Sequence, residues 1–305
     1  MELINKYRPK TFEQVIGHDR QVDALQSALE KGKARTVLFV GPSGVGKTTL
    51  ARIAATQLGE HELIEVNAAS DTGIDDMRAL MERCSYRPLN GESRVVIVDE
   101  FQGLSKAAVQ SWLKNLEEPA PWAYWFLCTT DYAKIPDNVR TRCLRIELRP
   151  LRLNDLMALL ADVAKKEGLK KVSADVVALC AEEAHGSPRQ ALSNFAICGQ
   201  CATEEEAADL LRTVVRESAE AVELARLLVK GTNLKTVWAL LNKLKEANPE
   251  SVRRILRAYV SKVALGARNE NDMRYFAHLL RVFDKPFDSG DGMAPLIIAC
   301  ERAVK

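Results

Sequence analysis

The chain has 305 residues, of which 47% are hydrophobic and 28% charged, and its formal net charge is +2. This composition is typical of a folded chain of two or three domains, and the small net charge excludes a protein that binds nucleic acid through a strongly basic surface as a whole. The N-terminus, MELINKYRPK, lacks the apolar stretch of a signal peptide, and the sequence has no run of 18 apolar residues. We therefore expect a cytoplasmic protein with no membrane contact.

The first 150 residues alternate short β-branched runs with helical patterns. Each run is apolar or nearly so throughout, which is typical of strands buried on both faces of a parallel sheet. The alternation predicts an α/β domain over residues 1–150. The predicted strands are Thr36–Val40, Leu63–Val66, Val95–Val98, Tyr124–Cys128 and Leu144–Leu148.

The remainder of the chain has no strand signal and divides into two helical domains. Residues 151–212 predict a small helical domain in which glycines separate the helices. Its predicted helices are Leu153–Glu167, Ser173–Ala184, and Ser187–Ile197 with a short helix after it.

Residues 213–305 predict an all-α domain with breaks at Gly231, Pro249 and residues 266–271. Within it, we expect Arg253, Arg254 and Arg257 on a solvated face.

The seven cysteines are an odd number, lie mostly within apolar runs, and indicate reduced core thiols. Cys198 and Cys201 form a CGQC pair, for which a redox or zinc site is the alternative. The sequence has no second Cys or His pair at metal-binding spacing, so we expect no zinc site there.

The stretch GPSGVGKT follows the first predicted strand and opens a helical run. A loop that wraps an anion with its own backbone N–H groups needs positions that tolerate positive φ, which glycines supply. Lys47 would place its charge on the β- and γ-phosphates of ATP, and Thr48 would offer a hydroxyl to Mg²⁺. The following helix adds its N-terminal dipole. The predicted phosphate-binding residues are Gly41, Pro42, Ser43, Gly44, Val45, Gly46, Lys47, Thr48 and Thr49.

The run VVIVDE ends a predicted strand with two acids that point to opposite sides of it. Asp99 can hold Mg²⁺ through water, and Glu100 can polarise the attacking water as a general base. A strand end with solvated acids is the alternative. ATP and Mg²⁺ are accordingly the predicted cofactors.

The run YWFLCTTD is another buried strand that ends in hydroxyl side chains. If this strand lies between the two described above, it brings Thr130 near the γ-phosphate, where the hydroxyl could orient water. A turn-capping role for Thr129 and Thr130 is the alternative.

A succession of motifs along the chain has residue types and spacing in common with one family. These motifs are KYRP (Lys6–Pro9), FEQVIGH (Phe12–His18), NAASDTGIDDMR (Asn67–Arg78), VVIVDEFQGLSKAAVQSWLKNLEEP (Val95–Pro119), TTDYAKIPDNVRTRC (Thr129–Cys143) and HGSPRQAL (His185–Leu192). The succession resembles the AAA+ ATPase subunits of sliding-clamp loaders: the bacterial polymerase III gamma/tau subunit, the small subunits of replication factor C and the large subunit of the T4-type phage loader. It covers about residues 3–195; beyond them, only helical content and length match.

The resemblance implies a fold and a set of residue roles. The fold would be an AAA+ P-loop domain with a parallel sheet, then a small helical lid domain and an all-α collar domain. Thr130 matches the residue called sensor 1, and Arg189 matches sensor 2, a lid arginine that reaches the phosphates. The residues that the resemblance implies around adenine are Tyr7, Arg8, Pro9, Val15, Ile16 and Gly17.

Arg142 matches an arginine that enters the ATP site of the neighbouring subunit in this family. It lies at the end of the predicted α/β domain, beside the start of the last predicted strand, and has no evident route to the phosphates of its own chain. Across an interface, it could neutralise charge on the γ-phosphate of a neighbouring subunit, as arginine fingers do. The nearby Arg140, Arg145, Arg149 and Arg152 are expected to form a basic surface stripe. The predicted catalytic residues are Glu100, Lys47, Arg142, Thr130 and Arg189.

The sequence departs from the family pattern in three places. Thr141-Arg142-Cys143 replaces the usual Ser-Arg-Cys, and Phe101-Gln102 follows the two acids where the family usually has Ala and a further polar residue. The four-cysteine zinc module of the bacterial gamma subunit is missing, although LSKAAVQSWLKNLEEP looks closer to that subunit than to the archaeal, eukaryotic or phage forms. A bacterial or phage-infected cell is the expected setting.

The resemblance implies that duplex DNA is held by its backbone with only a few contacts in each subunit, without base reading. A helix predicted over Ser105–Glu117 places Lys106, Gln110 and Lys114 in one polar stripe. Arg78, on another predicted helix, matches a family position that contacts the backbone. A solvated face is the alternative for the two lysines.

The predicted function is that of a clamp-loader ATPase subunit, which opens a sliding clamp with ATP, loads it onto primer–template DNA and hydrolyses ATP on release. The implied partners are the clamp, which could contact Met81–Tyr86, the DNA, further copies of this chain and a second loader subunit. Another DNA-associated AAA+ motor, such as a branch-migration helicase, is one alternative, but it would not explain KYRP or Arg142. A structural subunit without hydrolysis is the other, and the intact phosphate loop and acids disfavour it.

Overall fold

The computed structural model describes residues 2–32, 34–59, 61–68, 74–89, 91–169, 172–245, 247–287 and 292–304. The chain forms two compact units, Met1–Ala207 and Ala208–Lys305. The division of the first unit into an α/β domain and a lid near residue 150 stays a prediction.

The first unit is built on a five-stranded parallel sheet in the order β2–β3–β4–β1–β5. The predicted α/β class is confirmed, and each strand overlaps its predicted run. β4 lies between β1 and β3, which is the position required to bring Thr130 to the phosphate loop. The strands are β1 (Thr36–Val40), β2 (His61–Asn67), β3 (Ser93–Asp99), β4 (Ala123–Thr129) and β5 (Leu144–Glu147).

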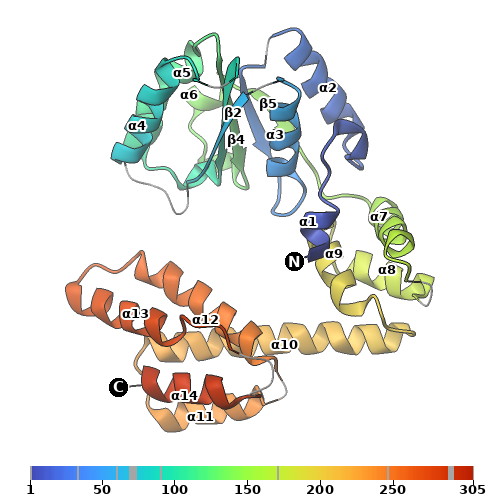
Figure 1. Ribbon diagram of the computed structural model, residues 1–305, viewed down its shortest axis with the longest axis vertical. Helices are drawn as coiled ribbons and strands as arrows, with labels where there is room; N and C mark the ends of the chain where they lie inside the picture. Colours follow the sequence, from blue (N-terminus) through green and yellow to red (C-terminus); the bar gives the residue numbers. More distant parts are fainter. Residues whose placement is uncertain are drawn as a thin grey trace. The chain divides into compact units, whose positions relative to one another are not determined.

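Helices cover both faces of this sheet (Figure 1). Because successive strand residues point to opposite faces, β1 divides its apolar side chains between two cores: Leu38 packs into one, and Val37 and Phe39 into the other. This double burial explains the continuous apolar strand runs. The first core includes α4 (Ile74–Ser85), α5 (Lys106–Glu117) and α6 (Asp137–Arg140), and the second includes α2 (Asp19–Glu30) and α3 (Lys47–Thr56).

Short elements complete the α/β part of the first unit. They are α1 (Glu2–Lys6) and three single turns, η1 (Phe12–Gln14), η2 (Phe101–Gly103) and η3 (Tyr132–Lys134). The turn η2 matters most for the site, because it joins the acidic end of β3 to the loop before α5. Ser105 caps α5 by accepting a hydrogen bond from the backbone N–H of Ala108 at 3.2 Å.

Three helices follow the sheet in the first unit, as predicted: α7 (Leu153–Lys166), α8 (Ala174–Glu182) and α9 (Pro188–Cys198). The prediction of a short helix after these three is wrong. One helix of 26 residues, α10 (Glu204–Val229), takes its place and contains the boundary between the two units, because that stretch has no glycine or proline to end it.

No helix among the described residues is both long enough and apolar enough to cross a bilayer. All seven cysteines are free, and each is buried except Cys143, which is half-buried. Burial raises the pKa of the Cys198 thiol to about 11, so this thiol is protonated at neutral pH. The expectation of core thiols is thus confirmed.

The second unit is helical throughout, with its helices packed around one core. After α10 it contains α11 (Leu234–Lys243), α12 (Pro249–Ala264), α13 (Glu270–Val282) and α14 (Ala294–Ala303). Asparagine caps begin three of them, because the side-chain oxygens of Asn233, Asn248 and Asn269 each accept a backbone N–H three residues on. The predicted break at Gly231 lies between α10 and α11, and Pro249 is the first residue of α12. The predicted break at residues 266–271 covers the end of the α12–α13 connection and the first residues of α13.

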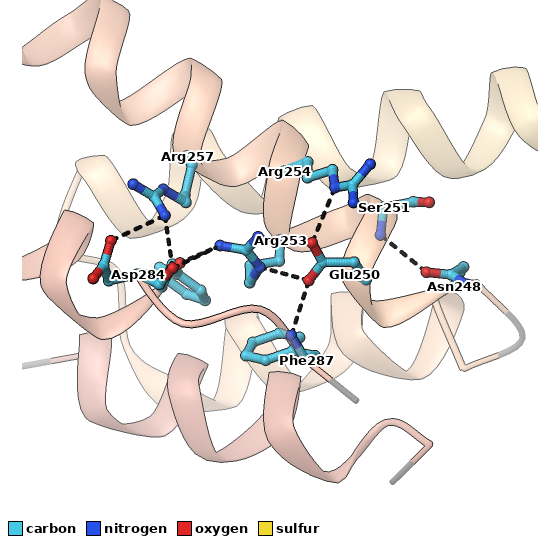
Figure 2. Close-up of polar contacts among 9 residues, drawn as sticks. Asn248, Glu250, Ser251, Arg253, Arg254, Arg257, Asp284 and Phe287 are labelled. Atoms are coloured by element: carbon cyan, nitrogen blue, oxygen red, sulfur yellow. Dashed lines mark hydrogen bonds and ion pairs between the residues drawn. The ribbon is translucent and has the colours of Figure 1, made fainter. Parts of the chain in front are cut away.

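Arg253 contradicts the expectation of a solvated face, since only 6% of it is exposed. Its Nε and Nη2 donate to the Glu250 carboxylate at 2.6 and 2.7 Å, and its Nη1 donates to the Phe283 carbonyl at 2.6 Å. The backbone N–H of Phe287 donates to the same carboxylate at 3.0 Å (Figure 2). Arg253 lies three residues before the buried Leu256 and therefore shares its face of α12, a signal that the sequence contained.

Replacing Glu250 with glutamine is expected to lower the free energy of unfolding of the second unit by about 3 kcal/mol at pH 7, because a buried guanidinium loses its partner. The hydrogen bonds from Arg253, chiefly, hold the pKa of Glu250 at about 2. A folded-state pKa below the unfolded one stabilises at pH values above the unfolded pKa, so this contribution fades as the pH falls from about 4.3 toward 2. Hydrogen exchange of the α12 amides in the full chain measures the loss.

Arg254→Gln is the matched control for this prediction. Arg254 also bonds to Glu250, but its side chain is 66% exposed, so its loss should cost less than about 1 kcal/mol. Equal protection of α12 in the two variants at pH 7 would contradict the prediction.

Candidate nucleotide-binding site

The phosphate loop joins β1 to α3, and its three glycines adopt positive φ values of 155°, 79° and 108° at Gly41, Gly44 and Gly46. A Cβ on Gly41 would lie 2.3 Å from the backbone oxygen of Leu148, and one on Gly44 would lie 2.2 Å from Ser187 Oγ. Side chains at these positions would collide with their neighbours, so the fold requires glycine there.

Lys47 begins α3 and is 6% exposed. Its Nζ donates to the carbonyls of Gly41 and Pro42, both at 2.8 Å, which places its charge inside the loop. Burial lowers its pKa, a cost that an anion beside it would offset. Gly41 and Pro42 therefore act in this structure through their carbonyls, and neither lines the cavity described next.

A small polar cavity lies against the loop and gathers three cations, Arg8, Lys47 and Arg189. Burial, then the neighbouring Arg52 and Arg189, lowers the pKa of Arg8. Such a concentration of positive charge is unfavourable by itself and suits a triphosphate. The predicted loop residues Ser43, Gly44, Gly46, Thr48 and Thr49 also line this cavity.

Thr48 and Asp99 lie together at the edge of the same cavity. The Thr48 hydroxyl donates to Asp99 Oδ2 at 2.9 Å, and the backbone N–H of Glu100 donates to Asp99 Oδ1 at 3.0 Å. Hydroxyl and carboxylate oxygens are ligands that fit Mg²⁺. Among the described residues no group of three or more His, Cys, Asp or Glu side chains could hold a metal, so Mg²⁺ here would also need phosphate and water oxygens.

A larger cavity of about 570 Å³ adjoins the loop on the side of the N-terminal segment. Its walls come from that segment, from the loop and from α7 and α9. Five of the six residues expected around adenine line it together with Val45, and Arg189 lines both cavities. Those five are Tyr7, Arg8, Pro9, Val15 and Ile16.

Gly17 is the residue that does not line this cavity. Its φ is +75°, and a Cβ there would lie 3.2 Å from Leu151 Cγ and from Asp155 Oδ2. Gly17 therefore allows the chain to turn close against α7. Tyr7 is tied to the same helix's C-terminal end, where its hydroxyl donates to the Glu167 carboxylate.

Glu100, Thr130 and Gln102 form a hydrogen-bonded group between the ends of β3 and β4. The Thr130 hydroxyl donates to Glu100 Oε2 at 3.1 Å, and Gln102 Nε2 donates both to that carboxylate and, at 2.9 Å, to Thr130 Oγ1. The Thr129 hydroxyl donates to Gln102 Oε1 at 2.7 Å. Glu100 also has φ of 52°, an uncommon value for a residue with a side chain. Glu100 lines the phosphate cavity, whereas Thr130 reaches it only through Glu100.

Gln102 was not predicted as a site residue. The sequence showed only that Phe101-Gln102 is an unusual continuation of the two acids. Its position two residues after Glu100, in the turn η2, is the signal that could have placed its amide beside the carboxylate.

Arg142 lies away from both cavities. Its guanidinium donates to the Asn138 carbonyl and to the Glu117 carboxylate, and 27% of its side chain is exposed. The predicted catalytic residues are therefore not all brought together within one chain. Arg142 is expected to lie apart from the others, because its predicted role is in the site of a neighbouring subunit.

The predicted DNA-contacting residues belong to α4 and α5. Gln110 and Lys114 are exposed on α5. The side chains of Arg78 and Lys106 lie outside the described part of the structure.

Comparison with known proteins gives sequence relatives among the subunits of DNA polymerase III. The family described as "DNA polymerase III, delta subunit" matches residues 61–152. DNA polymerase III subunit gamma of Buchnera aphidicola subsp. Baizongia pistaciae is 33% identical over 215 residues, 63% of this chain and 58% of that protein. DNA polymerase III subunit tau of Escherichia coli is 31% identical over 310 residues, 89% of this chain and 47% of that protein. The chain thus spans about half the length of these relatives.

Among solved structures, the RuvB Holliday junction branch migration motor of Thermotoga maritima superposes with a TM-score of 0.54. It is 19% identical over 95% of this chain and 85% of that chain. At this identity the likeness shows the fold.

The parallel sheet, the glycine loop and the cations and acids around it form a site that suits a nucleoside triphosphate. The relatives confirm the predicted resemblance to the bacterial polymerase III gamma/tau subunit, and this chain is similar in sequence to the gamma and tau subunits of bacterial DNA polymerase III.

Proposed function

We propose that this chain is an ATPase subunit of a sliding-clamp loader that binds ATP with Mg²⁺ and hydrolyses it at an interface with another subunit. The proposal rests on one arrangement of side chains. Three cations, the oxygens of Thr48 and Asp99 that could bind Mg²⁺, and Glu100 as the candidate general base line one cavity, whereas Arg142 lies outside it. In this proposal the residues at the cavity bind the nucleotide, and the arginine expected during hydrolysis comes from another subunit.

Each residue at the cavity has a distinct task in this proposal. Lys47 and Arg189 hold the β- and γ-phosphates, and the base lies in the larger cavity. Thr48 and Asp99 would hold Mg²⁺, which would neutralise charge on the phosphate oxygens. Glu100 orients and polarises the attacking water, with its carboxylate held by Thr130.

Arg142 would act on the nucleotide of the adjacent subunit. To do so, Arg142 would have to break its ion pair with Glu117. The loss is small, because an ion pair whose carboxylate is about half-exposed contributes about 1 kcal/mol or less to stability. A phosphate that gains negative charge in the transition state is the stronger partner. Hydrolysis would then depend on how the subunits pack.

DNA and the clamp would bind on the side of α4 and α5. Gln110 and Lys114, with Arg78 and Lys106, would contact the backbone of primer–template DNA. Within the segment proposed for the clamp, Met81 is 7% exposed and Tyr86 is 66% exposed, so the contact would come from the end near Tyr86. The loader would act in the cytoplasm, in a complex with further copies of this chain and a second subunit.

The experiment that tests this function is a measurement of ATP hydrolysis by the assembled complex. A sliding clamp together with primed DNA should raise the rate above the rates with either alone. Equal stimulation by single-stranded or branched DNA without any clamp would contradict the proposal and favour a helicase-like motor.

Replacing Gln102 with leucine is expected to lower ATP turnover about tenfold while leaving ATP affinity within about a factor of two. The amide donates to the Glu100 carboxylate and to Thr130, so its loss lets the carboxylate rotate, whereas no phosphate-binding residue is changed. Turnover and equilibrium binding are measured in parallel. Gln26→Leu is the control, because Gln26 is a half-buried residue of α2 that lines neither cavity. A faster Gln102→Leu enzyme would mean that Gln102 restrains Glu100 and would contradict the prediction.

A further inference from the structure

Arg140 departs from the basic surface stripe that the sequence predicts. Its side chain is 24% exposed, whereas those of Arg149 and Arg152 are 79% and 84% exposed. Its Nη1 donates to Asp137 Oδ1 at 2.9 Å within α6. Arg140 is therefore held by the protein, and it differs in this from the exposed arginines that follow it in the chain.

The second terminal nitrogen of Arg140 joins α6 to the turn η3. Nη2 donates to the backbone carbonyls of Tyr132 and Ala133, at 2.9 and 2.8 Å. The guanidinium also stacks on the Tyr132 ring, with its central carbon 4.5 Å from the ring centroid. A planar guanidinium can bond to carbonyls and lie against an aromatic ring at the same time. These contacts fix η3 and α6 relative to each other.

The turn η3 comes directly after the group that holds Glu100. The Thr130 hydroxyl donates to the Glu100 carboxylate, and Asp131 connects Thr130 to η3. The backbone N–H of Asp131 donates to Thr129 Oγ1 at 3.1 Å, and Asp131 Oδ1 accepts the N–H of Ala133 at 3.1 Å. A short, hydrogen-bonded segment thus leads from the carboxylate at the phosphate cavity to the carbonyls that Arg140 contacts.

The helix α6 leads in turn to Arg142. The backbone N–H of Arg142 donates to the Val139 carbonyl at 3.1 Å, so the end of α6 sets the position of the Arg142 backbone. A helix of four residues needs tertiary contacts to stay in place. Val139, buried in the core of the first unit, and Arg140 supply such contacts.

The position of its backbone matters most for Arg142 when its side chain acts on another subunit. The guanidinium then has to leave the Asn138 carbonyl and the Glu117 carboxylate. Its reach and direction depend from that point on α6. A charge that stabilises a transferred phosphate is effective only in a narrow range of positions, so a small displacement of α6 would be costly.

We propose that Arg140 is a positioning residue for Arg142. By holding α6 against η3, it places Arg142 for the phosphates of the adjacent subunit and ties that placement to Thr130 in its own chain. The inference rests on the proposed function, because it requires Arg142 to act across the interface. It adds a second arginine whose loss is felt in the neighbour's site.

Arg140→Met tests the inference, because methionine keeps an unbranched side chain and removes every donor. In the assembled complex kcat should fall about 10-fold to 100-fold, while KM for ATP and the ATP affinity of the separate chain stay within about twofold. Arg145→Met is the matched control. Arg145 lies 4.2 Å from the centroid of the same Tyr132 ring, but it donates to Glu147 Oε2 on its own strand. Its loss should leave kcat within about threefold.

Mixed assemblies separate a role in the neighbour's site from support of the chain's own site. Arg140→Met chains are mixed in equal amounts with Lys47→Ala chains, which keep Arg140 and Arg142. An Arg140→Met site beside a Lys47→Ala subunit should regain full turnover, so the mixture should reach about a quarter of the wild-type rate by random placement in a head-to-tail ring. A mixture that reaches only about half the rate of Arg140→Met assemblies would place the effect in the chain's own site and overturn the inference.

A second variant covers the case in which Arg140→Met does not bind ATP as a separate chain. Arg140→Lys keeps the charge and a donor for one of the two carbonyls, and the same mixing experiment applies to it. Its kcat should lie between those of Arg140→Met and the wild type.

Arg142→Ala separates failure of this inference from failure of the proposed function. If Arg142→Ala is severe while Arg140→Met keeps kcat within about threefold, only the positioning role of Arg140 is overturned. If Arg142→Ala also keeps full turnover, no arginine acts across the interface, and both the inference and the shared site are overturned.

Discussion

Replacing Glu100 with glutamine is expected to lower ATP turnover by about a hundredfold to ten-thousandfold while ATP still binds. The change keeps the size of the side chain and removes the charge that polarises water. Lys47, Arg8 and Arg189, which gather at the phosphate cavity, are unchanged. Turnover in the assembled complex and equilibrium binding of ATP, measured on the same preparation, separate the two effects.

Glu118→Gln is the control for this prediction, because Glu118 is an exposed acid at the end of α5 and lies outside both cavities. It should leave turnover within about a factor of two. If Glu100→Gln retained more than about a tenth of wild-type turnover, Glu100 would not be the general base.

The second large effect is expected for Arg142→Ala, which should reduce turnover in the assembled complex about a thousandfold or more. ATP affinity of the separate chain should not change, because Arg142 lines neither cavity of its own chain. The same substitution should therefore be silent in binding to the separate chain and severe in hydrolysis by the complex.

Arg149→Ala is the matched control for Arg142→Ala. Arg149 belongs to the same basic stretch, and its side chain is 79% exposed. Its ion pair is loose, because its Nε lies 3.8 Å from Glu147 Oε1. A basic surface stripe would make the two substitutions equivalent. A loss confined to Arg142 supports a specific role, and full turnover in Arg142→Ala would remove the arginine from the mechanism.

The features that sequence could predict are those determined by neighbours along the chain. The strand before the phosphate loop, the helix that starts at Lys47 and the acids at the end of β3 all depend on local pattern and turn chemistry. The proximity of Thr48 and Asp99 also followed, because parallel strands present their carboxyl ends at one edge of the sheet.

Two features that the sequence analysis missed had a local signal, but their hydrogen-bond partners include residues distant in the sequence. Arg253 is buried because Phe283 and Phe287 contribute backbone partners to its network. The position of Gln102 is supported by its hydrogen bond to Thr130, which directly follows β4.

A mixing experiment tests most directly whether two subunits build each catalytic site. Lys47→Ala chains lose the phosphate-binding lysine but keep Arg142, and Arg142→Ala chains keep the nucleotide site but lose the arginine. In assemblies formed from an equal mixture, an Arg142→Ala site beside a Lys47→Ala subunit regains every part, so turnover should return to about a quarter of the wild-type rate by random placement around a head-to-tail ring. Assemblies that contain both variants and remain as inactive as each variant alone would contradict a shared site.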